Sequence, residues 1–227
     1  MRICSISLLV ILAKTSWAQQ APSGEWASIL VSVKLNEQWA SVTDFGYRTI
    51  GSDFRYYQNY FRTGVRYSLD RHWSMAGGVG FFNSKISFAK DTREFGHEVR
   101  LWQDVYRLSP LKNKWILNHR FRLEEKHFDK TSTRDPYYSL RFQYRLLGGY
   151  RFSKNWNLQL GPEWMENLIR EKILLDQVRL YALLAYQSSK GYGITLGYFY
   201  SMRKAYDQHV YTIALSKNVQ RHVHLQQ

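Results

Sequence analysis

Hydrophobic and polar residues alternate along most of this chain, which is the pattern of β-strands whose two faces meet different surroundings. The stretch WILNHRFRLEEKHF, at residues 115–128, shows the alternation clearly. Trp115, Leu117, Phe121 and Leu123 stand at odd positions, whereas most even positions carry Asn, Arg, Glu or Lys. We therefore predict a strand with one apolar face and one densely charged face.

The same alternation returns in segment after segment. No apolar run beyond the N-terminal segment approaches the roughly 18 residues of a membrane-spanning helix. The pattern predicts an all-β chain. The other alternating segments are residues 28–35, 57–69, 98–106, 138–146, 157–164 and 177–186.

A short polar turn followed at once by an aromatic residue recurs five times, at Trp39, Trp73, Trp115, Trp156 and Tyr192. These residues are 34, 42, 41 and 36 positions apart, which suits two strands, one tight turn and one longer loop per repeat. Short turns that alternate with longer loops are typical of outer-membrane barrels. The longer connections expected here are residues 49–55, 84–96, 129–136, 166–175 and 203–207.

These five residues are the predicted membrane-interface aromatics. The four Trp residues fall on the apolar phase of their strands and at the same end of a hairpin, so they are expected at one height. Trp favours the boundary between lipid and water. This favours an apolar face in lipid and a charged face in the lumen. The alternative is a water-soluble sandwich or a lipocalin-like barrel.

The predicted fold is an antiparallel up-and-down transmembrane β-barrel of about 10–12 strands, with short periplasmic turns and longer extracellular loops. Closed bacterial barrels have even strand numbers, so ten and twelve are the alternatives. Twelve keeps the cleanly alternating first strand, Trp26 to Leu35, and takes residues 219–225 as the last strand. We favour twelve; ten leaves residues 219–227 as a basic tail. The SKN of a tight turn recurs at Ser216–Asn218, so a turn is expected there before residues 219–225.

Residues 1–18 have the pattern of a secretory signal peptide, with a basic start at Arg2, an apolar core and a cleavage motif that ends at Ala18. Cleavage there removes Cys4, the one cysteine, so the predicted barrel domain, residues 19–227, has no disulfide. These features predict export and a location in the outer membrane of a Gram-negative cell.

The formal charge is +14, and it falls only to +12 when the predicted signal peptide is removed. Strong basicity often indicates nucleic acid binding. Here the export signal argues against it, and so does the spacing of the arginines, which recur at every second position within strands rather than in runs. We expect no nucleic acid partner.

The charged phase of the predicted strands brings arginines and carboxylates into one lumen, where ion pairs between neighbouring strands are tolerable. We interpret this ladder as structural, with attraction of anionic solutes to the excess arginines as the alternative. About twelve strands are fewer than the sixteen to eighteen of aqueous porins, so a narrow or plugged interior is expected. The ladder residues are Arg62, Arg66, Glu98, Arg100, Asp104, Arg120, Arg122, Glu124, Arg141, Arg145, Glu163 and Arg179.

Motifs of common catalytic and cofactor sites are absent: the sequence has no Walker-type loop, GxGxxG, GxSxG, HExxH or Cys-based metal pattern. His119 falls on the lipid-facing phase, and His97 and His209 can approach the same surface. No Ser or carboxylate can be placed beside them from the sequence. We predict no catalytic residue, no metal site and no cofactor.

Three segments carry a family resemblance: EVRLWQDVY, LNHRFRLEEKHF and YSLRFQYRLLGGYRF, at residues 98–106, 117–128 and 138–152. They resemble an uncharacterised outer-membrane β-barrel family, the domain of unknown function twenty-four-ninety. The matching positions are Arg100, Trp102 and Gln103, then Arg120, Arg122 and Glu124, then Arg141. The early NEQWASVTDFGYR and the late GYFYSMRKAYDQHVYTIAL are also similar. The resemblance implies a fold and a location, and no known activity. One departure is the ending HVHLQQ, because outer-membrane strands usually end in an aromatic residue.

Three classes of function remain open. The favoured one is a structural or scaffolding barrel whose loops bind partners. The alternatives are a narrow anion-passing channel and a lipid-modifying outer-membrane enzyme. The expected partners are outer-membrane lipid, the insertion machinery during biogenesis, and an anionic solute or an envelope component.

Overall fold

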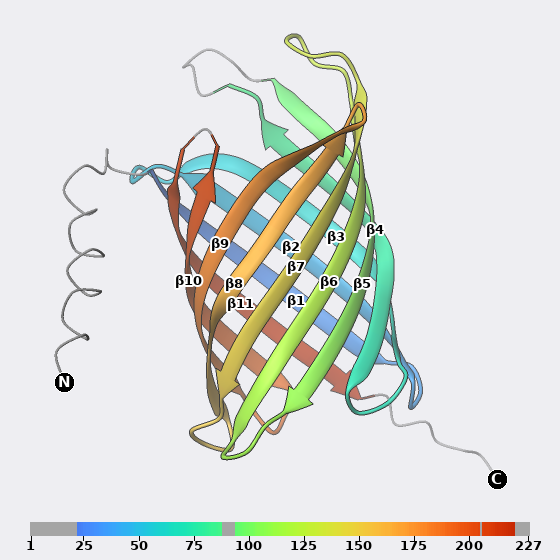
Figure 1. Cartoon of the computed structure of the whole chain (residues 1–227), viewed down its shortest axis with the longest axis vertical. Helices are drawn as coiled ribbons and strands as arrows, with labels where there is room; N and C mark the ends of the chain where they lie inside the picture. Colours follow the sequence, from blue (N-terminus) through green and yellow to red (C-terminus); the bar gives the residue numbers. More distant parts are fainter. Residues whose placement is uncertain (1–21, 88–93, 205, 221–227) are drawn as a thin grey trace, which may run out of the picture.

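The computed structural model describes residues 22–87, 94–204 and 206–220, and the predicted signal peptide lies outside them. The described residues form eleven strands that close into one barrel, in which the strands are tilted relative to the barrel axis (Figure 1). No described helix is long and apolar enough to cross a membrane. The strands are β1 (Ser23–Lys34), β2 (Trp39–Ile50), β3 (Arg55–Ser68), β4 (Trp73–Lys85), β5 (Phe95–Pro110), β6 (Trp115–Phe128), β7 (Tyr137–Tyr150), β8 (Trp156–Ile169), β9 (Lys172–Gln187), β10 (Tyr192–Arg203) and β11 (Gln208–Gln220).

Five tight turns lie together at one end of the barrel, which we call the turn end; the opposite end is the loop end (Figure 1). In three of these turns a polar side chain accepts a hydrogen bond from the backbone N–H of the Trp that opens the next strand. This local hydrogen bond favours the turn and fixes where the strand starts. The pairs are Asn36–Trp39 (2.8 Å), Asp70–Trp73 (2.7 Å) and Ser153–Trp156 (3.1 Å).

Several connections at the loop end are shorter than the sequence indicated. The one expected over residues 84–96 is shorter at both ends, because β4 reaches Lys85 and β5 starts at Phe95. The connection expected over residues 166–175 is wrong, because β8 and β9 continue into a turn of two residues, Arg170 and Glu171. Both have positive φ, 47° and 66°, as a type I′ hairpin turn requires. The connection expected over residues 49–55 is also shorter, since β2 reaches Ile50 and β3 starts at Arg55.

Consecutive strands pair in antiparallel fashion throughout, and a parallel pair of β1 with β11 closes the barrel. This seam runs from Ser23 opposite His209 to Lys34 opposite Gln220. The predicted all-β up-and-down barrel is therefore confirmed. Because the number of described strands is odd, β1 starts at the loop end and β11 finishes at the turn end (Figure 1).

The preference for twelve strands is wrong, and so is the turn expected at Ser216–Asn218. These residues continue β11 through to Gln220 and pair with Leu30 to Ser32. An extended β11 gives the backbone of β1 a hydrogen-bonding partner along its full length, which a turn would remove. Residues 221–227, the rest of the expected last strand, lie outside the described part of the chain.

Candidate functional site

The barrel interior holds the predicted ladder residues. Eleven of the twelve lie inside the barrel, where they form ion pairs and hydrogen bonds with one another or lie next to residues that do. Arg66 is apart: its guanidinium lies over the Tyr106 ring, 5.3 Å from the ring centroid, toward the turn end. The side chains come from strands β3, β5, β6, β7, β8 and β9, where they alternate with outward-facing residues.

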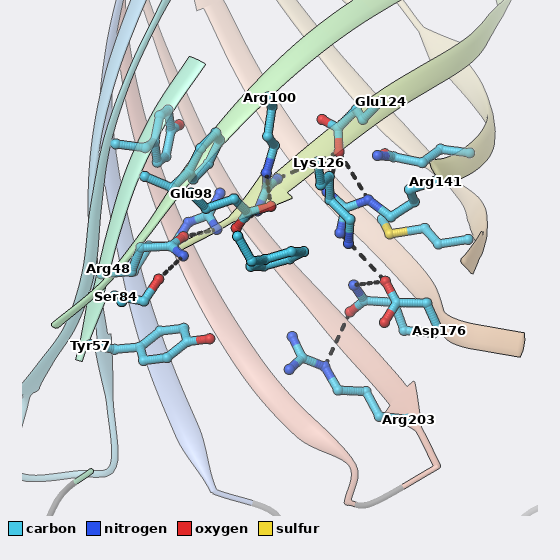
Figure 2. Close-up of a pocket in the computed structure, with 18 of the residues that line it drawn as sticks. Arg48, Tyr57, Ser84, Glu98, Arg100, Glu124, Lys126, Arg141, Asp176 and Arg203 are labelled. Atoms are coloured by element: carbon cyan, nitrogen blue, oxygen red, sulfur yellow. Dashed lines mark hydrogen bonds and ion pairs between the residues drawn. The ribbon is translucent and has the colours of Figure 1, made fainter. Parts of the chain in front are cut away.

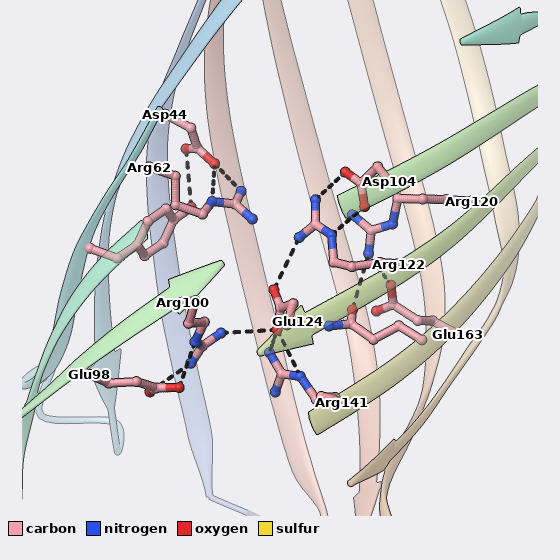
Figure 3. Close-up of polar contacts among 12 residues, drawn as sticks. Asp44, Arg62, Glu98, Arg100, Asp104, Arg120, Arg122, Glu124, Arg141 and Glu163 are labelled. Atoms are coloured by element: carbon pink, nitrogen blue, oxygen red, sulfur yellow. Dashed lines mark hydrogen bonds and ion pairs between the residues drawn. The ribbon is translucent and has the colours of Figure 1, made fainter. Parts of the chain in front are cut away.

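Glu124 of β6 lies at the centre of this network (Figure 3). Its carboxylate accepts hydrogen bonds from Arg141 of β7, with Nε at 2.9 Å, and from Arg100 of β5, at 3.5 Å. Arg122 lies 3.6 Å away on the same strand. Glu124 is 1% exposed, so three guanidinium groups compensate one buried carboxylate.

Arg122 also makes the best-formed pair in the barrel. Its Nε and one terminal nitrogen each donate to Asp104 of β5 at 2.6 Å, in the bidentate geometry that suits guanidinium and carboxylate. The hydroxyl of Tyr106 donates to the same carboxylate at 2.6 Å. Asp104 therefore has partners on both oxygens although it is buried.

Two further pairs extend the network around the barrel wall. Glu163 of β8 accepts from Arg120 at 2.5 Å and from the Tyr181 hydroxyl at 2.7 Å. Asp44 of β2, which the sequence analysis omitted, pairs with Arg62, whose Nε lies 3.1 Å from the carboxylate (Figure 3). The buried carboxylates of the interior thus connect neighbouring strands of the barrel through charge-assisted hydrogen bonds.

Next to the ion pairs, on the side of the turn end, apolar side chains fill part of the interior. Val42, Ala76 and Trp102 form a buried cluster with Tyr106 against it. The indole of Trp102 lies across β3, where a Cβ on Gly64 would come within 2.8 Å of its Cζ2 atom. Gly64 therefore provides the space that this indole occupies.

On the side of the loop end the interior opens into a cavity of about 610 Å³, which we call the loop-side cavity (Figure 2). Its floor is formed by ladder residues, and its rim includes Ile86, Gly96 and Thr131. Two loops are tied together at the loop end, because Glu94 accepts hydrogen bonds from the hydroxyl and the backbone N–H of Ser132, the latter at 2.6 Å. Both hydrogen bonds hold the pKa of Glu94 below its usual value, and the bond from the hydroxyl has the larger effect.

A family model matches residues 23–210, and the family is described as a protein of unknown function (DUF2490). The chain belongs to this family. The match covers β1 to β10 and the start of β11, so it includes every strand that contributes to the ion-pair network. No curated protein and no solved structure matches the chain.

The five predicted interface aromatics all open strands at the turn end, where each is exposed on the outer surface. Three of them pack against a tyrosine on the neighbouring strand. The ring centroids are 4.8 Å apart for Trp39–Tyr67, 5.0 Å for Trp115–Tyr150 and 5.0 Å for Trp156–Tyr186. Together they form an aromatic belt at one height of the barrel.

Two of the three histidines that the sequence placed near the outer surface are hydrogen-bonded to a tyrosine. His119 is hydrogen-bonded to the Tyr144 hydroxyl at 2.9 Å, and His209 to the Tyr198 hydroxyl at 2.8 Å. Both are pairs of aromatic side chains on neighbouring strands. Within residues 22–87, 94–204 and 206–220, no group of three or more His, Cys, Asp or Glu side chains could hold a metal ion.

Sequence reasoning missed several charged residues of the loop-side cavity: Arg48, Lys126, Asp176 and Arg203. Lys126 shares the inward phase of Glu124, so the alternation of β6 could have found it. Arg48 lies four residues after Asp44 on β2, on the same phase. Arg203 lies in a segment that the sequence indicated as a loop, and Asp176 lies between the loop expected over residues 166–175 and the alternating segment 177–186, so the inward direction of neither was predicted.

Proposed function

We propose that the protein is an outer-membrane β-barrel that spans the lipid bilayer with its strands. One observation supports this above all: every described strand presents a large apolar side chain on its outer face. These side chains are between 42% and 52% exposed. They are Ile29, Phe45, Phe61, Phe81, Leu101, Phe121, Phe142, Leu160, Leu180, Leu196 and Ile213, one from each of β1 to β11.

The buried residues support the same proposal. Among the described residues, fifteen of the buried ones are polar or charged and nine are hydrophobic, so the interior is more polar than apolar. A water-soluble barrel needs the opposite distribution, because burial of apolar area is the main driving force for folding in water. An apolar belt around the whole barrel also exceeds the exposed patches of a few hundred Å² that soluble monomers present.

The orientation follows from the two ends of the barrel. Tight turns face the periplasm and longer loops face outward in bacterial barrels, so the turn end is periplasmic and the loop-side cavity opens to the outside. Export with cleavage of residues 1–18 precedes insertion. The Trp residues at the turn end then lie at the inner boundary of the bilayer.

Within the membrane we assign the barrel a structural or interaction role rather than free conduction. The pairs Arg122–Asp104 and Arg141–Glu124 join strands inside the lumen, and the Trp102 cluster occupies space beside them. Opening a wide aqueous path would require these buried charges to separate, which is costly. The excess of arginine favours a narrow anion-passing channel as the second candidate.

Fractionation of cells that express a tagged full chain tests the location. We expect the protein in the outer-membrane fraction, released by detergent and not by salt or carbonate. An epitope inserted in the loop at residues 129–136 should be detected on intact cells, whereas one in the turn at residues 111–114 should not. Recovery in the soluble periplasmic fraction would contradict the proposal.

Planar-bilayer recording separates the two candidate roles. A structural barrel should give no stepwise conductance, whereas a narrow channel with an arginine-rich lumen should conduct with selectivity for anions. Exchange of Glu124 for Gln should then increase anion selectivity only if the lumen conducts.

A further inference from the structure

The loop-side cavity has a large excess of positive charge. The residues that line it include twelve Lys or Arg side chains and four Asp or Glu side chains. Two further carboxylates, Asp44 and Asp104, pair with Arg62 and Arg122 of the lining, so the excess is six positive charges. The four carboxylates are Glu98, Glu124, Glu163 and Asp176, and each is already engaged by at least one arginine. Among the described residues, Arg48, Lys126 and Arg203 of the lining take part in no ion pair.

One of these cations is Lys126. It is 6% exposed, and in the described part of the chain its ammonium group has no hydrogen bond and no ion pair. Its Nζ lies 5.3 Å from the centre of the Phe128 ring. A buried ammonium without a hydrogen-bonding partner is costly unless an anion or ordered water contacts it.

Arg48 and Arg203 have only neutral partners. Arg48 donates to the amide oxygen of Gln58 at 2.6 Å and stacks on Trp26, 4.0 Å from the ring centroid. Arg203 donates to the amide oxygen of Gln177 at 3.1 Å. These contacts fix both guanidinium groups in position and leave their charges uncompensated.

The three cations surround the same space. Each lies within three residues of the loop end of its strand: Arg48 on β2, Lys126 on β6 and Arg203 on β10. Figure 2 shows them at different places around the cavity. An arrangement of fixed cations from three strands is a preorganised site for a ligand with more than one negative group.

We propose that the loop-side cavity binds a solute that carries at least two oxyanion groups, phosphate or carboxylate, with Arg48, Lys126 and Arg203 as its contacts. Guanidinium forks recognise both groups through two parallel hydrogen bonds. The volume of about 610 Å³ suits a small organic ligand or a short polyphosphate. That the solute arrives from outside the cell rests on the proposed function; the binding site itself does not.

Calorimetric titration of the purified full chain in a zwitterionic detergent tests this proposal. The probes are tripolyphosphate, citrate and the neutral disaccharide trehalose. We expect saturable binding of at least one anion, weakening with added salt, and no binding of trehalose. The stronger anion identifies the preferred oxyanion. Failure of both anions to bind would overturn the proposal.

The site variant combines Arg48→Gln, Lys126→Gln and Arg203→Gln. The matched control combines Lys112→Gln, Lys154→Gln and Lys190→Gln, which removes the same charge from exposed residues of the turn end. We expect the site variant to weaken binding at least about tenfold, because each charged contact contributes on the order of one decade of affinity at most sites. The control should change it less than twofold. Equal losses would show a general charge effect and contradict the site.

Circular dichroism melting in the same detergent checks that each variant is folded. If the site variant does not fold, Arg203→Gln alone replaces it, because this change leaves no carboxylate without its partner. About tenfold weaker binding is then expected. The location test and this titration test separate proposals. A soluble protein that binds the anions would contradict only the location, and an inserted barrel that binds neither anion would contradict only the binding site.

Discussion

Strand β6 has two faces that differ in almost every property. Phe121 on the outer face is 52% exposed, whereas Glu124 on the inner face is 1% exposed. In a water-soluble protein the apolar side chain would be the buried one. The inner face is held by directional ion pairs. The outer face offers an apolar surface whose side chains pack only against neighbours in the wall, as Phe121 does on Tyr144, with ring centroids 4.6 Å apart. We therefore expect different substitutions to destabilise the two faces. At the inner face the damaging change removes one partner of an ion pair, and at the outer face it adds a charge.

The largest effect is expected at the inner face. Glu124→Gln leaves Arg100, Arg122 and Arg141 with too little negative charge in a buried site. We expect a loss of about 3–5 kcal/mol in the free energy of unfolding, the range for breaking a buried ion pair. Urea unfolding in detergent or lipid vesicles, followed by Trp fluorescence, measures it.

The control for this change is Glu37→Gln. Glu37 pairs with Lys34 at 2.9 Å, but its side chain is 92% exposed. Exposed ion pairs contribute about 0–1 kcal/mol, so this variant should unfold almost as the parent does. Equal, small losses for both variants would mean that the interior is hydrated enough to replace the missing charge.

An added charge on the outer face is expected to have the next largest effect. Phe121→Arg places a guanidinium near the middle of β6, on the side assigned to lipid, at a cost of about 2–4 kcal/mol. Insertion into lipid vesicles, measured as the folded fraction, should fall sharply. Phe121→Leu is the control and should insert normally. Normal insertion of the Arg variant would show that this face does not contact lipid.

A smaller loss of stability is expected from a substitution where β3 lies close to β4. A Cβ on Gly64 would meet the Gly77 carbonyl and the Trp102 indole, the latter at 2.8 Å. Gly64→Ala should cost about 1–3 kcal/mol, as over-packing does. At Gly148, the nearest atoms would be 3.8 Å and 4.0 Å from the new Cβ, so Gly148→Ala is the matched control with little loss. The unfolding midpoints in urea compare the two.

The smallest effect is expected at the turn end, where both faces meet water. Asp70 accepts hydrogen bonds from the backbone N–H groups of His72, at 2.6 Å, and Trp73, at 2.7 Å, and these hold the pKa of Asp70 below its usual value of 3.8. A carboxyl with a lowered folded pKa stabilises the protein above its unfolded pKa. That contribution is lost as the pH falls through the folded pKa.

The test of this turn is the pH dependence of the melting temperature. Below about pH 4 the parent should lose slightly more stability than Asp70→Asn, because Asn keeps an oxygen acceptor and does not titrate there. Identical slopes for the two proteins would show that the Asp70 carboxylate adds nothing to the turn.

Much of the fold could be predicted from the alternation of side chains. Arg120, Arg122 and Glu124 differ from Phe121 and Leu123 by one position each, and a strand turns such neighbours to opposite faces. The strand number could not be predicted in this way. Ser216–Asn218 resembles the SKN of a real turn, and only the pairing of β11 with β1 keeps it extended. A parallel seam leaves no local signal in the sequence.

The candidate site was predictable to a similar degree. The inward phase identified Glu124 and Arg141, but periodicity gives direction and no distance, so the sequence could not say which arginine meets which carboxylate. Nor could it show that Lys126 is left without a partner in the described interior, since that depends on Glu98 of β5 and Glu124 of β6 and on their engagement with Arg100 and Arg141.

The central claim is that the outer face of the barrel contacts lipid. Single cysteines in place of Phe121, Ile213 and Gln143, with Cys4 replaced, can carry nitroxide labels in the protein reconstituted into vesicles. Collision with oxygen and with a water-soluble nickel chelate is then measured by electron paramagnetic resonance. We predict that labels at 121 and 213 meet oxygen more than the chelate, and that the inward label at 143 does not. Labels at 121 and 213 that meet the chelate more would contradict the account.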